Sequence, residues 1–345
     1  MPLALIADRP GHAVLRSYDE PPLQADQVRV RSLFSSFKHG SELRAFRADS
    51  ADASDRWDGE LRLHRRGEPA ADSFPRALGN MCMSEVVEVG DEVDNLKMGD
   101  RVFAHQVTRE THTLTAAGLT VAPPGVSPQA LMYWDPTDFA LGAVRDAPVR
   151  LGDRVGVFGL GAIGLVVAQA ARLAGARWVA VSDPIAMRRD AAERHGADLV
   201  LDPSQADAGL EVKLQTENRG VDIAFETSGS YAALEDALRA TCFQGTVVST
   251  AFYQPKGGLS LAGEWHRNRI QIVSSRACSE PLPQYGWDFA RICSESLALL
   301  VEGRLEVDDL IAPIVPMAQA AEAYEEINAH PERSIKLGID HTLGP

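Results

Sequence analysis

The stretch VGVFGLGAIGLVVAQAARLAGA, residues 155–176, decides the fold of this 345-residue chain. A short apolar run leads into a glycine-rich turn, and a helix pattern rich in alanine, leucine and valine follows. In such a strand–turn–helix unit, Gly159 allows the tight turn, Gly161 lets the backbone approach a pyrophosphate, and Gly164 lets the helix pack on the strand. The N–H groups that open the helix face the phosphates, and the helix dipole favours their negative charge. The stretch therefore predicts a dinucleotide-binding site.

The segments that follow favour this prediction over a glycine turn in some other α/β protein. Asp183 ends the next apolar run and lies 24 positions after Gly159. An acid about 20 residues after such a turn typically binds the adenosine ribose. Further strand patterns alternate with helix patterns, and the strands are expected at 199–202, 221–226, 245–250 and 270–275. This alternation predicts a doubly wound parallel sheet in an α/β protein.

Composition excludes several classes of function. The length allows about two domains, and 45% hydrophobic with 24% charged residues is typical of a soluble globular protein. The net charge of −14 argues against a nucleic-acid partner, because no basic excess is left to neutralise phosphates. The start of the chain lacks the pattern of a signal peptide, and no apolar run has the length of a membrane span. The scattered cysteines predict a reducing compartment such as the cytoplasm, and they are Cys82, Cys242, Cys278 and Cys293.

The segments on either side of the nucleotide-binding region are richer in β patterns. Strands are expected within 1–34 and 78–103, at 311–315 and at 334–339, and helices near 288–302 and at 317–330. Residues 47–76 are polar and charged, which is typical of a solvated surface loop. The alternative is an active-site lid, because long loops in compact domains are often functional.

Taken with these features, several runs resemble the medium-chain dehydrogenase/reductase superfamily, in particular its alcohol and sorbitol dehydrogenase group, over nearly the whole chain. The resemblance is carried by Gly79, EVVEVGDEV, GDRVF, the GLGAIG turn, GVDIAFETSGS at 220–230, QGTVVSTAFY at 244–253 and the AEAYE run from Ala321. It implies a GroES-like catalytic domain from residues 1–145 and 282–345. A Rossmann NAD-binding domain, residues 146–281, is inserted between them. It also implies a small-molecule substrate and a homodimer.

The sequence departs from this family at the metal. Many members hold a catalytic zinc with a cysteine, a His-Glu pair and a third cysteine or glutamate. The matching places here hold His39, then Asn80 and Met81, then Trp134 and Asp135. Zinc takes three protein ligands of cysteine, histidine or carboxylate type, so the set is one short. The four-cysteine lobe of a structural zinc is also missing between residues 102 and 119. We therefore predict a zinc-independent enzyme.

The resemblance implies a replacement for the metal. His39 is expected as general acid/base, either through Ser41, which matches the family's proton relay, or directly. Asp135 would orient it, with Lys38 nearby, and a structural histidine beside a turn is the alternative. Asn80 and Trp134 are expected at the substrate.

A second polar cluster, GEWHRNR at 263–269, lies between two predicted strands of the nucleotide-binding domain. His266 and Asn268 could reach a polyhydroxy substrate or the dimer partner. A solvated loop is the alternative, and the sequence does not separate the two interpretations.

Cofactor contacts follow from the resemblance. Asp183 is expected on the ribose hydroxyls of NAD with Arg188 nearby, and Ile163 on the nicotinamide side. Lys336 matches a residue that reaches the pyrophosphate, with a solvent-exposed lysine at a strand edge as the alternative. The other expected contacts are Gly159, Gly161, Gly164, Thr227, Thr250, Ala251 and Phe252.

These expectations combine into one predicted activity. We expect an NAD(H)-dependent oxidoreductase that interconverts a secondary alcohol and a ketone, on a sugar, cyclitol or polyol. The alternatives are a zinc-free quinone or enone reductase, which more often uses NADPH, and a nucleotide-binding protein without catalysis.

Overall fold

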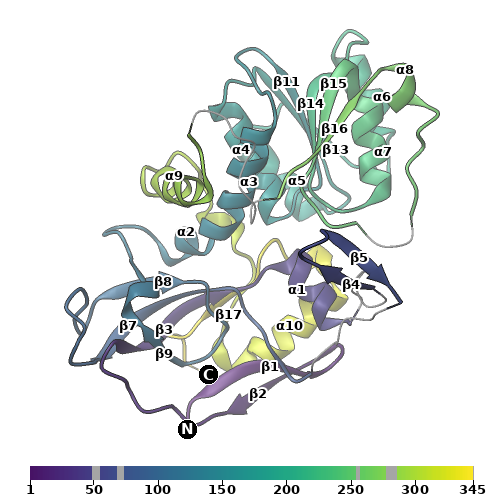
Figure 1. Cartoon of the computed structure of the whole chain (residues 1–345). Coiled ribbons are helices and arrows are strands. Elements are labelled where there is room, and N and C mark those ends of the chain that lie inside the picture. Colours follow the sequence, from purple (N-terminus) through teal and green to yellow (C-terminus); the bar gives the residue numbers. More distant parts are fainter. Residues whose placement is uncertain (49–54, 68–73, 254–256, 277–285, 345) are drawn as a thin grey trace. The chain divides into compact units, whose positions relative to one another are not determined.

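Both ends of the chain build one unit, and the middle of the chain builds a second (Figure 1). The computed structural model describes residues 1–48, 55–67, 74–253, 257–276 and 286–344. Unit 1 comprises Met1–Met132 and Ile311–Pro345, and unit 2 comprises Tyr133–Leu310. The chain passes from unit 1 to unit 2 at residues 132/133 and back at 310/311, whereas the expected domain boundaries were 145/146 and 281/282. The reason is that α3 (Trp134–Asp146) packs on α4 (Ala162–Leu173) and on α9 (Phe289–Val301), so both α3 and α9 belong to unit 2.

Unit 1 is organised around strand β3 (Gln27–Ser36), which pairs antiparallel with β7, β9 and β18. Val28 and Val30 are buried, whereas Arg31 points to solvent, as expected for a strand with one face on a core. The sheet runs in the order β10-β8-β7-β3-β18-β17 with β9 beside β3. Its other strands are β7 (Met81–Val89), β8 (Arg101–Ala104), β9 (Thr111–Thr115), β10 (Thr120–Val121), β17 (Ile314–Pro316) and β18 (Gly338–Asp340).

A second core of unit 1 joins the two ends of the chain. Tyr324 lies between Phe37 and Phe46, with both ring centroids 4.9 Å from its own. All three rings are buried, and edge-on aromatic packing of this kind stabilises a core beyond the area that it removes from water. This core is formed by α1 (His39–Phe46), α10 (Ala320–Ala329) and a small sheet of β1 (Leu3–Arg9), β2 (His12–Ser17) and β6 (Arg76–Ala77). Helix α2 (Pro128–Met132) packs instead on β7 and β3 of the main sheet.

The polar segment 47–76 contains an exposed hairpin. Strand β4 (Asp55–Asp58) pairs with β5 (Leu63–Arg66), and Trp57 packs on His64 at a ring-centroid distance of 5.0 Å. Residues 49–54 and 68–73 lie outside the described part. The expected surface loop is therefore a hairpin over residues 55–66, and its role as a lid stays a hypothesis.

Unit 2 is a doubly wound sheet of six parallel strands in the part of the chain that the structure describes. The order β13-β12-β11-β14-β15-β16 places the first strand, β11, beside β14, so the chain reverses its winding direction between these two strands. The strands are β11 (Arg154–Phe158), β12 (Trp178–Ser182), β13 (Leu199–Leu201), β14 (Val221–Glu226), β15 (Thr241–Ser249) and β16 (Gln271–Ser274). The connecting helices are α4, α5 (Ala186–Arg194), α6 (Ala208–Gln215), α7 (Tyr231–Ala240) and α8 (Glu264–Arg267).

The predicted α/β class, with a GroES-like β-rich unit and a Rossmann sheet, is confirmed. Among the described helices, none combines the length and the apolar character that crossing a bilayer requires.

Two imidazoles lie near each other at the main sheet of unit 1, one buried on β9 and the other partly buried just after β18. His112 on β9 is 3% exposed, and burial lowers its pKa to about 3, with further lowering from Arg109 and His341. Burial also lowers the pKa of His341 to about 4, against a smaller opposing effect of Asp340. The hydroxyl of Ser35 lies 3.0 Å from His341 Nε2. Both rings are therefore neutral in the folded chain near neutral pH.

This pair predicts a loss of stability in mild acid. A histidine with a lowered folded pKa is protonated first in the unfolded chain, so its contribution is present above pH 6.5 and is lost as the pH falls toward the folded pKa. Between pH 7 and pH 5, His112 should lower the free energy of unfolding by about 2 kcal/mol. Urea melts at pH 7 and pH 5 measure the free energy of unfolding at each pH. In His112→Leu, this free energy should fall by about 2 kcal/mol less between the two pH values than in the wild type. The control His330→Gln, at a side chain that is 45% exposed, should leave the loss as in the wild type. An unchanged loss in His112→Leu would contradict the assignment.

Candidate active site

The glycine turn lies between β11 and α4, at the carboxyl edge of the parallel sheet. Gly159 has φ +98°, and a Cβ there would lie 2.8 Å from the backbone nitrogen of Ser228. A Cβ on Gly164 would lie 1.9 Å from the carbonyl oxygen of Gly159. Gly161 differs, because its Cβ direction meets nothing within 4 Å. The fold therefore requires two of the three glycines, and the third faces open space where a pyrophosphate could approach the backbone.

Asp183 follows β12 and is held next to this turn. Its side chain accepts hydrogen bonds from the backbone nitrogens of Leu160, at 2.7 Å, and Ile185, at 2.8 Å. Arg188 Nη1 lies 3.8 Å from the same carboxylate, and Arg189 donates to the backbone carbonyl of Asp183. Each carboxylate oxygen can accept more than one hydrogen bond, so the anchored group keeps acceptor capacity for ribose hydroxyls.

The turn after β14 lies against the glycine turn, and the turn after β15 lies against the turn after β14. Thr227 Oγ1 donates to the carbonyl oxygen of Gly159 at 2.6 Å. The backbone nitrogen of Thr250 donates to the carbonyl oxygen of Glu226 at 2.9 Å, and the side chain of Phe252 is exposed. The structure thus gathers the predicted cofactor residues of unit 2 at one edge of the sheet. Ile163 lies in the first turn of α4, and Ala251 lies between Thr250 and Phe252.

His39 is the first residue of α1 in unit 1, and its ring is anchored to the backbone. The backbone N–H of Leu337 donates to His39 Nε2 at 2.9 Å. A neutral imidazole has one protonated nitrogen, so Nδ1 carries the proton while Nε2 accepts this bond. In that neutral ring, Nδ1 is the donor and Nε2 the acceptor. To take up a proton at Nε2, it would have to give up the bond to Leu337.

Glu42 organises the loop around His39, although the sequence indicated it only as a neighbour. Its buried carboxylate accepts from the backbone nitrogens of Gly79, at 2.6 Å, and Lys38, at 3.1 Å, and from the hydroxyl of Tyr324, at 3.2 Å. Burial raises the pKa of Glu42 against the lowering effect of these donors. Glycine is required at position 79, because its φ is +116° and a Cβ would lie 2.3 Å from the backbone nitrogen of Thr108.

Other predicted residues of unit 1 fall near the same loop. The backbone nitrogen of Asn80 donates to the carbonyl oxygen of Ser36 at 2.9 Å. Its buried Nδ2 has no hydrogen-bond partner among the described residues, which suits a donor reserved for a substrate oxygen. Ser41 is exposed.

Lys336 is 2% exposed, and its ammonium donates to the carbonyl oxygen of Phe37 at 2.6 Å. The alternative of a solvent-exposed lysine is wrong. Contact with a pyrophosphate stays a prediction.

Trp134 and Asp135 begin α3 and belong to unit 2. Trp134 Nε1 donates to the carbonyl oxygen of Cys293 at 2.9 Å, and Asp135 is 5% exposed. A pairing of Asp135 with His39, which belongs to unit 1, stays a prediction.

His266 and Asn268 lie at the other edge of the sheet. They precede β16, which runs parallel to β15, and the carbonyl oxygen of Asn268 accepts from the backbone nitrogen of Gln244 near the start of β15. The glycine turn follows β11 at the carboxyl edge, where ligands of such sheets bind. The two residues are therefore far along the strands from the cofactor edge, and this placement argues against the predicted substrate contact.

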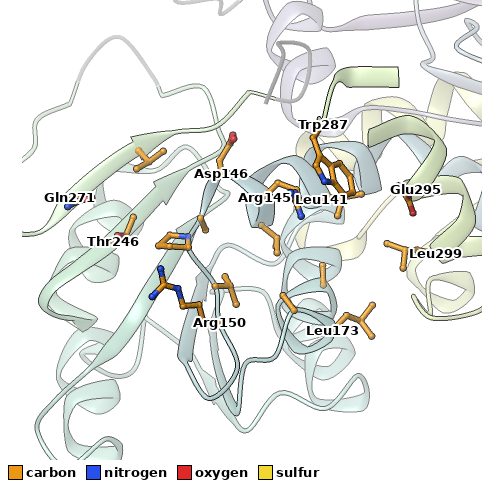
Figure 2. A pocket seen from close by; sticks show the side chains of 17 residues that line it. Leu141, Arg145, Asp146, Arg150, Leu173, Thr246, Gln271, Trp287, Glu295 and Leu299 are labelled. Carbon is orange, nitrogen blue, oxygen red and sulfur yellow. The ribbon is translucent and has the colours of Figure 1, made fainter. Parts of the chain in front are cut away.

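A cavity of about 1150 Å³ in unit 2 is separate from this site (Figure 2). Residues of α3, α4, α9, β15 and β16 line it, and the guanidinium of Arg145 lies 3.9 Å from the ring centroid of Trp287. None of the predicted site residues lines it.

Potential metal ligands do not converge in the described ranges. No group of three or more histidine, cysteine, aspartate or glutamate side chains there could hold a metal ion. Cys82, Cys242 and Cys293 are free thiols, and Cys278 lies outside the described residues.

The known proteins that this chain resembles are dehydrogenases. A family model described as zinc-binding dehydrogenase matches residues 162–291. D-guloside 3-dehydrogenase from Escherichia coli (strain K12) is 40% identical, over 97% of this chain and 99% of the relative. (R,R)-butanediol dehydrogenase from Bacillus subtilis (strain 168) is 30% identical, over 70% of this chain and 73% of the relative.

Solved structures share the fold at lower identity. The 2R,3R-butanediol dehydrogenase from Bacillus subtilis matches with a TM-score of 0.77 at 22% identity, covering 99% of each chain. Galactitol-1-phosphate dehydrogenase from Escherichia coli also matches with a TM-score of 0.77, at 20% identity, covering 98% of this chain and 99% of that one.

The open side of Gly161 gives a test of the nucleotide site. Gly161→Ala places a methyl group where nothing in the protein stands, so the thermal midpoint should change by no more than about 2 °C. The same methyl group should raise the Kd for NADH about tenfold, as measured by calorimetry. Gly118→Ala in unit 1, also open around its Cβ, is the matched control and should change neither quantity. Unchanged NADH affinity in Gly161→Ala would contradict the site.

Proposed function

We infer the function of this chain from its family: it belongs to the medium-chain, zinc-type dehydrogenases. We propose that it is an NAD(H)-dependent oxidoreductase that interconverts a secondary alcohol and a ketone. The observation that carries the proposal is the edge of unit 2 where the open Gly161 and the anchored Asp183 adjoin, because together they suit a dinucleotide.

We propose a sugar derivative as substrate, of the D-guloside type oxidised at its position 3. The support is the 40% identity over nearly the whole length to an enzyme of that name. The buried amide donor of Asn80 and the exposed hydroxyl of Ser41 suit a polyhydroxy compound. Turnover of NAD⁺ with a panel of glycosides, polyols and simple secondary alcohols tests this assignment.

Two other functions follow from the same fold. A quinone or enone reductase would oxidise NADPH with conjugated substrates, and a nucleotide-binding protein without catalysis would turn over neither panel. Turnover of enones but not of alcohols, or of neither class, would contradict the proposed activity. We also propose a cytoplasmic homodimer, and light scattering at the monomer mass of 37.3 kDa would contradict the dimer.

We propose that His39 acts as a hydrogen-bond donor to the substrate oxygen. Its Nε2 accepts from the backbone N–H of Leu337, so in the neutral ring the proton is on Nδ1, and this N–H is the donor that we assign to the substrate oxygen. A fixed N–H donor stabilises the negative charge that develops on the oxygen during hydride transfer. The exposed hydroxyl of Ser41 would relay the alcohol proton to bulk water. The general acid/base role expected from the sequence is the alternative to this donor role and stays a prediction.

Cofactor choice gives the first prediction of this subsection. Asp183 should accept hydrogen bonds from a free ribose 2′-hydroxyl and repel a 2′-phosphate. We expect kcat/KM with NADH at least about tenfold above that with NADPH, a difference of about 1.4 kcal/mol. Asp183→Asn should narrow this ratio, whereas the exposed Asp190→Asn on α5 should not. Comparable or better kcat/KM with NADPH in the wild type would overturn the NAD(H) assignment.

A second prediction concerns the dependence of activity on a metal ion. At the family's metal positions, His39 and Asp135 are potential ligands but Asn80, Met81 and Trp134 are not, so the residues present do not complete a zinc site. Purified protein should carry much less than one zinc per chain by elemental analysis, and chelators should leave activity intact. Stoichiometric zinc, with activity lost on chelation and restored by zinc, would show that the metal is required.

A third prediction concerns the role of His39. His39→Ala should lower kcat by about 10² to 10³, the usual cost of losing one oxyanion donor. His39→Asn keeps an N–H donor and should retain at least about ten times more activity than the alanine variant, with an unshifted pH profile. If both variants lose activity equally and an ionisation disappears from the kcat profile, His39 is a general base instead.

A further inference from the structure

We propose that Glu226 is a positioning residue for the nicotinamide end of the cofactor site. Its buried side chain joins the turn after β14 to the turn after β15, and the second turn carries the segment 250–252 that is expected to line the nicotinamide. The proposal rests on the proposed NAD(H) site. The proposal goes beyond that site, because it assigns a role to a residue that contacts no predicted ligand.

The carboxylate of Glu226 is fully buried and receives donors from both turns. It accepts from the backbone nitrogens of Ser228, at 2.7 Å, and Gly229, at 3.1 Å, and from the hydroxyl of Ser228. The hydroxyl of Tyr253 donates to its other oxygen. Burial raises the pKa of Glu226, while these donors lower it. A carboxylate suits this place because an ionised acid accepts at both oxygens and donates at neither.

Both ends of the nicotinamide segment are attached to this one residue. Thr250 donates to the backbone carbonyl of Glu226 through its nitrogen, at 2.9 Å, and through Oγ1, at 3.1 Å. Tyr253, at the other end, is bonded to the carboxylate and accepts from Ser249 Oγ at 3.2 Å. The side chain of Phe252, which lies between them, is 68% exposed. Glu226 therefore restrains this exposed turn at two points, Thr250 and Tyr253.

The restraint extends to the glycine turn. A Cβ on Gly229 would lie 2.4 Å from the carbonyl oxygen of Phe252, and one on Gly159 would lie 2.8 Å from the backbone nitrogen of Ser228. The glycine turn, the turn after β14 and the turn after β15 are thus in successive close backbone contact, and Glu226 is hydrogen-bonded to the last two. Since close-packed groups transmit small shifts, releasing the carboxylate should move the nicotinamide segment and leave the adenosine half, around Asp183, in place.

The experiment compares two ligands that differ at the nicotinamide end. Calorimetry gives the Kd for NADH and for ADP-ribose, which has both phosphates and the adenosine but no nicotinamide. Tyr253→Phe removes the donor to the carboxylate, and Glu226→Gln removes its charge. Each should raise the Kd for NADH about five- to tenfold, as expected for the loss of a hydrogen bond to a charged group, and leave the Kd for ADP-ribose within about twofold. The kcat should fall in both variants.

The matched control is Tyr231→Phe. Its ring centroid lies 5.1 Å from that of Tyr253, but its hydroxyl forms no hydrogen bond among the described residues. It should leave both affinities unchanged. If Tyr253→Phe and Glu226→Gln weaken the binding of NADH and of ADP-ribose equally, or weaken the binding of neither compound, the positioning role is overturned. A wild-type chain that binds neither compound would instead overturn the NAD(H) site itself. Thermal midpoints separate unfolding from loss of binding, and Tyr253→Phe remains informative if Glu226→Gln does not fold.

Discussion

No side chain fits at Gly164, because a Cβ there would lie 1.9 Å from the carbonyl oxygen of Gly159. This backbone contact sets how closely α4 can pack on β11, the first strand of the parallel sheet. The open direction of Gly161, the anchoring of Asp183 to Leu160 and the contacts of Thr227 all depend on the path of the same turn. The proposed dinucleotide site at this edge therefore depends on how one helix and one strand meet.

The sequence predicted most of this unit because strong periodic patterns report backbone structure directly. The runs at 178–182 and 221–226 coincide with β12 and β14, and Asp183 follows its strand as expected. The chain ends were predicted less well. The expected strand at 334–339 is only β18, Gly338–Asp340, and Lys336 lies before it, inside the core. Tertiary contacts, which no local pattern encodes, decide such positions.

The candidate site was predicted unevenly for a related reason. Glu226 and Glu42 act through hydrogen bonds to residues distant in the sequence, so spacing alone gives no signal for them. For His266 and Asn268, the residue types left a contact with substrate or dimer partner and a solvated loop equally open, although the position of their segment carries further information. Their segment precedes a strand of a parallel sheet, and segments before such strands lie at the amino edge, away from the ligand edge. For His39 the residue was predicted, but its bond to Leu337 required the fold.

The bond between His39 and Leu337 has a consequence for the order of folding. Strands β3 and β18 pair across about 300 residues of sequence, and closing so long a loop in a disordered chain carries a high entropic cost. Unit 2 is one continuous segment between them, so it can form while unit 1 still lacks residues 311–345. Once unit 2 has folded, it shortens the effective distance between the halves of unit 1. Unit 2 then acts as an internal scaffold for assembling the loop that holds His39.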